Sequence, residues 1–185
     1  MFRKNEQREF FAHHMLLLAA ECEIAEAGAS ECGHFNKCLA AMVMTALAVE
    51  ALANAVGSRV VSDWSAFEPL RPLDKIERLV GQLSIVRDIT KEPWTTLVFL
   101  GGFRNDIAHP KPEAVSKEYV LPEPGLTKTA FAAPSSTLER EITPGNARRV
   151  FAAVRDLKGI LTDALPVEKR FGIYVDMWSG STSVA

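Results

Sequence analysis

The run from Phe103 to Pro110 carries the residue types best suited to chemistry in this chain. It holds Arg104, Asn105 and His109 within six positions, at the end of an apolar segment. Arginine is a permanent cation whose planar group holds phosphate. Histidine is the side chain whose unperturbed pKa suits proton transfer near neutral pH. Together the two residue types can bind a phosphodiester and move its protons without a metal ion.

The spacing of these residues does not by itself place them at one site. On an α-helix, at about 100° per residue, positions five apart such as Arg104 and His109 lie ~140° from each other. Asn105 and His109 are four apart and share a face. The long side chain of Arg104 can still reach the same side. The alternative is an ordinary helix end, with Arg104 in a salt bridge and His109 capping carbonyl groups.

The composition limits the kind of site to expect. A chain of 185 residues with 48% hydrophobic residues suits one compact domain with a substantial core. Its 21 lysines and arginines nearly balance 23 acidic residues. A protein that holds many phosphates is usually more basic. Any nucleic-acid site is therefore expected to be small and local, or shared between two subunits.

The cysteines and the N-terminus favour a reduced, cytoplasmic environment. Three cysteines are an odd number for a secreted disulfide framework, and the charged N-terminal residues do not resemble a signal peptide. The most apolar stretch, residues 38–56, is interrupted by Glu50 and Asn54, so we expect no membrane span.

No metal or cofactor is expected either. The candidate zinc ligands lack a C-x2-C pair, which favours free thiols over a metal site; they are Cys22, Cys32, His34 and Cys38. His13 and His14 are predicted to be partly buried helix histidines rather than ligands.

Apolar periodicity predicts an all-α bundle of four to five helices. The predicted helices cover about residues 5–27, 35–56, 73–86, 93–109 and 143–165. Gly57 is expected to end the second helix as a left-handed cap, and Thr143 with Pro144 is a strong start signal for the last. Residues 1–165 would form one domain. Residues 111–142 contain four prolines and are predicted to be a long irregular insertion, partly extended at 119–121. Residues 166–185 are predicted to be a C-terminal strap followed by seven disordered residues.

The Arg-Asn-x-x-x-His pattern, near the end of a late helix, resembles the signature of the HEPN superfamily (higher eukaryotes and prokaryotes nucleotide-binding domain). Two earlier segments are also similar to that superfamily. Residues 48–54 are an apolar helical stretch that carries Glu50 and Asn54, and residues 73–79 resemble the segment that often follows. The resemblance covers about residues 5–165, and its specific part is the Arg104–His109 run.

The resemblance implies a function and a set of roles. Catalytic members are metal-independent ribonucleases that often act as dimers, with the arginine and histidine of both subunits at a shared cleft. Arg104 would bind the scissile phosphate, His109 would act as general base or acid, and Asn105 would orient His109 or the phosphate. Glu50 would hold Arg104, and Asp106 would support the site. The expected product carries a 2′,3′-cyclic phosphate.

The same resemblance implies the possible partners. RNA would be the substrate, a second copy of the chain would complete the site, and a protein antitoxin would be a further partner if the enzyme is a toxin or defence nuclease. The alternative within the superfamily is a non-catalytic helical dimer that binds a nucleotide, RNA or a protein.

Overall fold

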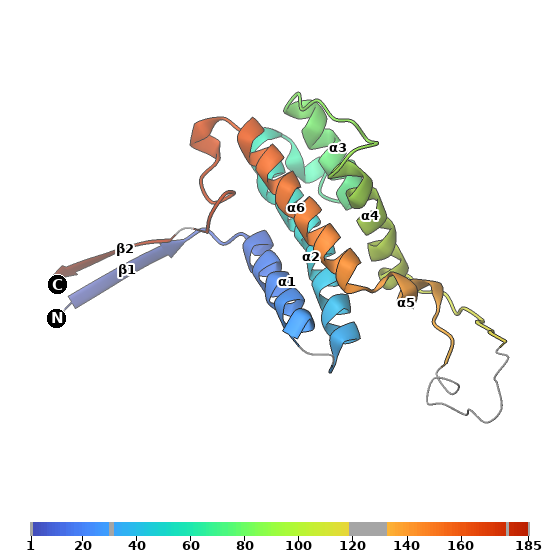
Figure 1. Ribbon diagram of the computed structural model, residues 1–185. Coiled ribbons are helices and arrows are strands. Elements are labelled where there is room, and N and C mark those ends of the chain that lie inside the picture. Colours follow the sequence, from blue (N-terminus) through green and yellow to red (C-terminus); the bar gives the residue numbers. More distant parts are fainter. Residues whose placement is uncertain (1, 30–31, 119–132, 177, 185) are drawn as a thin grey trace.

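The computed structural model describes residues 2–29, 32–118, 133–176 and 178–184. In this part of the chain the fold is a helical bundle with one two-stranded sheet (Figure 1), so the predicted predominance of helix is confirmed. The helices are α1 (Ala12–Ala29), α2 (His34–Val60), α3 (Pro72–Gln82), α4 (Trp94–Ala108), α5 (Thr137–Glu141) and α6 (Pro144–Ala164). Short 3₁₀ turns lie at Trp64–Ala66 and Val167–Lys169.

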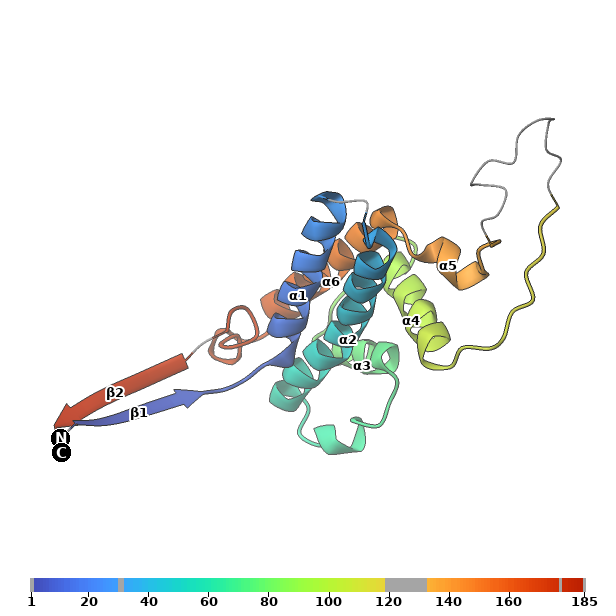
Figure 2. The same ribbon diagram turned by 90° about the horizontal axis from the view of Figure 1, so that it is seen from below.

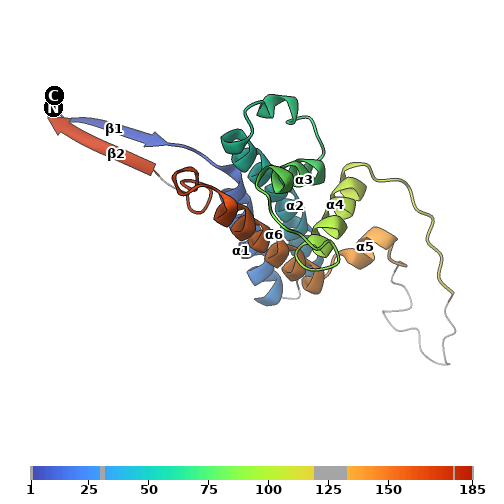
Figure 3. The same ribbon diagram turned by 90° about the horizontal axis from the view of Figure 1, so that it is seen from above.

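The long helix α2 is the centre of the bundle. Helices α1, α3, α4 and α6 all contact it, as Figures 1 and 3 show. Its inward positions are mostly apolar and include several alanines, which let neighbouring helices approach closely. Among them are Ala41, Met42, Val49, Leu52, Ala53 and Val56, all nearly or fully buried. Helix α2 is also long and apolar enough to cross a membrane, but 56% of its most apolar 18-residue stretch is buried inside the protein. The same properties are typical of the core helix of a soluble protein.

The prediction that Gly57 ends this helix was wrong. Helix α2 continues to Val60, and Gly57 lies inside it. The ring of Trp64 occupies the space that a Cβ atom at Gly57 would fill. Glycine is therefore required here for close packing rather than for a left-handed cap. Trp64 and Trp94 are both buried.

The two chain ends form a ribbon that the sequence patterns did not reveal. Strand β1 (Phe2–Arg8) pairs antiparallel with β2 (Trp178–Val184), with Arg8 opposite Trp178. The first predicted helix therefore begins at Ala12 rather than near residue 5, and the prediction of seven disordered C-terminal residues was wrong for residues 179–184. The ribbon projects from the bundle and carries both termini (Figures 1 and 2).

The predicted insertion is shorter than expected, because part of it is helical. Residues 119–132, which include the predicted extended stretch, lie outside the described residues. Helix α5 begins with a capping box, in which Ser136 and Glu139 satisfy each other's backbone N–H groups. Helix α6 begins as predicted, with the Thr143 hydroxyl accepting from the backbone N–H of Asn146 at 3.1 Å.

The segment after α6, residues 166–176 (the strap), returns to the start of α1. His13 is fully buried, and its Nε2–H donates to the carbonyl oxygen of Ile173 at 3.1 Å. The Nε2–H of His14 donates to the carbonyl oxygen of Gly172 at 2.6 Å. Gly172 has a φ of 77°, and the ring of Phe11 lies where its Cβ would be. Two histidines and one glycine thus fasten the strap to α1.

Candidate functional site

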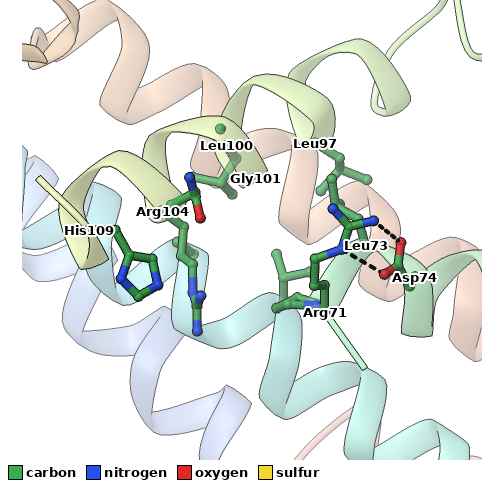
Figure 4. A pocket seen from close by; sticks show the side chains of 13 residues that line it. Arg71, Leu73, Asp74, Leu97, Leu100, Gly101, Arg104 and His109 are labelled. Carbon is green, nitrogen blue, oxygen red and sulfur yellow. Dashed lines mark hydrogen bonds and ion pairs between the residues drawn. The ribbon is translucent and has the colours of Figure 1, made fainter. Parts of the chain in front are cut away.

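A cavity of about 530 Å³ opens where α2, the start of α3 and α4 meet (Figure 4). Helix α2 supplies small apolar residues at its base, the start of α3 supplies an ion pair, and α4 supplies the longest wall. The lining residues are Ala46, Val49, Arg71, Pro72, Leu73, Asp74, Leu97, Leu100, Gly101, Gly102, Arg104, Asn105 and His109. All three residues predicted to be catalytic, Arg104, Asn105 and His109, are therefore at one cavity.

The end of α4 explains how Arg104 and His109 come together despite their spacing. Phe103 is buried and anchors the last turns of α4 in the core. His109 is the C-cap, and its φ of −132° and ψ of 54° have left the helical region, while its N–H still donates to the Asn105 carbonyl at 2.9 Å. The ~140° separation expected on a regular helix no longer applies. Figure 4 shows both side chains on the same side of the cavity.

The positive charge of Arg104 is available to a ligand, because the carboxylate nearest to it is already paired with another residue. Glu50 Oε1 lies 2.9 Å from Lys75 Nζ, whereas Glu50 Oε2 lies 3.9 Å from Arg104 Nη2. Lys75 is fully buried and also donates to Asn54 Oδ1 at 3.0 Å. The first distance is that of a strong charge-assisted hydrogen bond, whereas the second is too long for a hydrogen bond. The Arg104 side chain is 40% exposed.

The opposite end of the cavity holds a second arginine with a different environment. Arg71 donates from Nε to Asp74 Oδ2 at 2.8 Å and from Nη2 to Asp74 Oδ1 at 3.1 Å. These bonds raise the pKa of Arg71 above its ordinary value and fix the plane of its guanidinium. Asp74 offsets the charge of Arg71, so this end of the cavity is close to neutral.

Two residues of this arrangement were missed by the sequence analysis. Lys75 and Arg71 lie in or beside a segment that was noted only for its resemblance to the superfamily. A signal for Lys75 was present, since Glu50 and Asn54 are four apart on an apolar helix and such a polar pair needs a polar partner when buried. Arg71 stands just before α3 and shows no comparable pattern.

The two residues predicted to support the site differ in their placement. Glu50 does not line the cavity but contacts Arg104 and Lys75 behind it. Asp106 is exposed and is not among the residues that line the cavity. Glu50 therefore contacts one of the predicted catalytic residues, Arg104, whereas Asp106 does not line the cavity.

The cysteines and remaining histidines do not converge. Cys22 is exposed on α1 and Cys38 is buried in α2, while His34 Nδ1–H donates to the Ala27 carbonyl oxygen at 2.8 Å. Within the described ranges, no group of three or more His, Cys, Asp or Glu side chains is placed to hold a metal ion.

The cavity therefore offers a small anion site with a titratable group. With His109 neutral, the charges of Arg71 and Arg104 exceed that of Asp74 by one. Such a site suits a phosphate ester next to an apolar wall, with an imidazole within the same opening. Comparison with protein-family models, curated proteins and solved structures found no match for this chain.

Proposed function

We propose that this chain is a metal-independent endoribonuclease of HEPN type, which cleaves RNA to give a 2′,3′-cyclic phosphate. The observation that carries the proposal is that Arg104, Asn105 and His109 line one open cavity. Neither Arg104 nor His109 is buried. The resemblance of the Arg104–His109 run to the superfamily supplies the class of reaction.

Arg104 would bind the scissile phosphate. Its guanidinium can hold two phosphate oxygens at once and stabilise the charge that develops on them during attack. The Lys75–Glu50 pair supports this role as a positioning element. Because Lys75 satisfies Glu50 at 2.9 Å, Glu50 can orient Arg104 from 3.9 Å without neutralising it.

His109 would move the protons. The neutral imidazole takes the proton of the ribose 2′-hydroxyl while the 2′ oxygen forms a bond to phosphorus. The bond from phosphorus to the 5′ oxygen then breaks, and that oxygen receives a proton from an imidazolium. Asn105, which lines the same cavity as His109, would orient the imidazole or a phosphate oxygen.

The proposal extends to a homodimer. The attacking and leaving oxygens lie on opposite sides of the phosphorus, so two imidazoles serve them better than one. A second copy of the chain, with its cavity facing the first, would supply the other His109. The nearly neutral charge of the chain fits a small shared site better than a long RNA-binding track. A cytoplasmic toxin or defence nuclease, with a protein antitoxin, is the setting that we propose for such an activity.

The test is cleavage of labelled RNA in the presence of EDTA. Wild type, Arg104→Ala and His109→Ala are compared with Arg155→Ala, which removes an exposed arginine of α6 away from the cavity. We expect cleavage by wild type and Arg155→Ala and its loss in the other two. Equal cleavage by all four would refute the assignment. RNA that binds without being cleaved by wild type would favour the non-catalytic alternative.

A further inference from the structure

The cavity is longer than a phosphate needs. Its lining residues on α4 run from Leu97 to His109, about 18 Å along the helix axis. Arg104 and His109 lie together on one side, while Arg71 and Leu97 lie on the other (Figure 4). A phosphate bound between Arg104 and His109 therefore leaves most of the cavity for another part of the same ligand.

Beyond Arg104 and His109 the cavity has an apolar wall. Leu97 and Leu100 are each 2% exposed and present apolar atoms from α4. Gly101 lets Leu73 of α3 lie directly against α4, since a Cβ at Gly101 would be 2.5 Å from Leu73 Cδ1. An apolar wall disfavours a second charged group and accepts a flat, weakly polar one.

The two arginines are suited to different parts of a ligand: Arg104 to a phosphate, and Arg71 to a flat base. Arg104 faces a carboxylate that a buried lysine already neutralises, so its charge is available. The charge of Arg71 is offset by Asp74, while its side chain is 85% exposed and its guanidinium plane is held by two hydrogen bonds. A fixed, exposed guanidinium plane is a surface on which nucleobases stack.

From this asymmetry we propose that the cavity binds one unpaired ribonucleotide, with its phosphate at Arg104 and His109 and its base along the Leu73 wall against Arg71. Arg71, clamped by Asp74, is then the residue that selects the substrate. The identity of the ligand as RNA rests on the proposed function. A base inside a duplex is paired and stacked and does not reach such a cavity.

Binding of small probes tests the division of the cavity. Adenosine 3′-monophosphate, adenosine 5′-monophosphate, ribose 5-phosphate and inorganic phosphate are titrated into the full chain by calorimetry. At least one nucleotide is expected to bind about tenfold more tightly than ribose 5-phosphate. Arg71→Lys should abolish that difference and leave ribose 5-phosphate binding unchanged, because lysine keeps the charge and loses the plane. Arg104→Ala should weaken all four.

Two results would overturn the proposal: nucleotides that bind no more tightly than ribose 5-phosphate, or an Arg71→Lys variant that keeps the full preference.

A variant that fills part of the cavity is a second, independent test. A Cβ added at Gly102 meets nothing within 4 Å, and the same holds at Gly28 on α1, outside the cavity. Gly102→Leu should weaken nucleotide binding, whereas Gly28→Leu should not. Equal nucleotide binding by both would count against a base at this wall.

A hairpin RNA separates this inference from the proposed function. Cleavage confined to the unpaired loop is expected. Cleavage within the paired stem would overturn the inference and leave the endoribonuclease proposal intact. No cleavage by wild type, together with a nucleotide preference that depends on Arg71, would refute the nuclease and leave the nucleotide site standing.

Discussion

Two histidines of this molecule, His13 and His109, lie in opposite surroundings. His109 follows the last residue of α4, lines an open cavity and is exposed. His13 is fully buried at the start of α1, where it holds the strap through the carbonyl oxygen of Ile173. The two residues lie at the ends of different helices, and each follows apolar residues in the sequence.

The difference lies in what surrounds each ring. Because a carbonyl oxygen only accepts, His13 carries its proton on Nε2, and its buried Nδ1 has no partner among the described residues. Burial, together with the nearby His14 and Lys158, lowers the pKa of His13 from 6.5 to about 4. His13 therefore stays neutral and structural at pH 7. A histidine is available for proton transfer where the fold leaves it room and a ligand site.

The largest expected effect comes from removing His109. His109→Ala should lower RNA cleavage by about 10²- to 10⁴-fold, the usual effect of losing a general acid or base. Its exposed position predicts a change in the free energy of unfolding within about 0.5 kcal/mol. Cleavage kinetics and urea denaturation measure the two effects. A variant that cleaves normally but unfolds easily would place His109 with the structural histidines.

Removing His13 should have the reverse effect. His13→Ala leaves a cavity in the core and frees the carbonyl group of Ile173, so we expect a loss of about 3 kcal/mol in the free energy of unfolding. Cleavage per folded molecule should be unchanged. The check is urea denaturation of the whole chain beside an activity assay in buffer. Undiminished stability would show that the strap does not depend on this residue.

The burial of His13 also predicts how the free energy of unfolding depends on pH. The unfolded histidine binds a proton below about pH 6.5, whereas folded His13 does so only below about pH 4. In that window the unfolded state binds more protons, so stability falls as the pH is lowered from 6.5 to 4, by roughly 3 kcal/mol in total. Burial also lowers the pKa of His14, which adds to the effect in the same direction. Urea midpoints at several pH values should show a slope that His13→Ala reduces, and an identical slope in both proteins would contradict this account.

A smaller effect is expected from the glycine of the strap. Gly172→Ala places a Cβ in the ring of Phe11 at a positive φ, which should cost about 1 to 3 kcal/mol of stability. Gly28→Ala is the matched control, because its Cβ meets nothing and alanine favours the helix. Thermal unfolding of both variants measures the difference. If both are stabilised, the strap does not pack as described.

Much of the bundle could be predicted because its signals are local. The apolar period of α2 and α6 and the Thr143 cap each depend on residues a few positions apart, and the Arg104–His109 run lies within one helix end. The ribbon could not be predicted in this way. Strand β1 pairs residues 2–8 with residues 178–184, and no short-range pattern records a partner at the other end of the chain.

The candidate site likewise contains residues that a local pattern predicts and residues that it does not. Arg104, Asn105 and His109 were recognised as a group within one segment. Arg71 and Lys75 enter the site through tertiary packing of α3 on α2 and α4, which the sequence does not specify. The exposure of His109 and the burial of His13 also arise from packing, since both histidines follow apolar residues in the sequence.

The most direct test of the central claim uses an RNA with one cleavage site in two forms, with either a hydroxyl or a hydrogen at the 2′ position of the attacking ribose. Both RNAs are incubated with the wild-type protein in the presence of EDTA, and the masses of the products are measured by mass spectrometry. We predict a 2′,3′-cyclic phosphate from the ribose form, none from the deoxyribose form, and none from either form with His109→Ala. Cleavage of the deoxyribose form, or a cyclic phosphate made equally well without His109, would contradict the proposal.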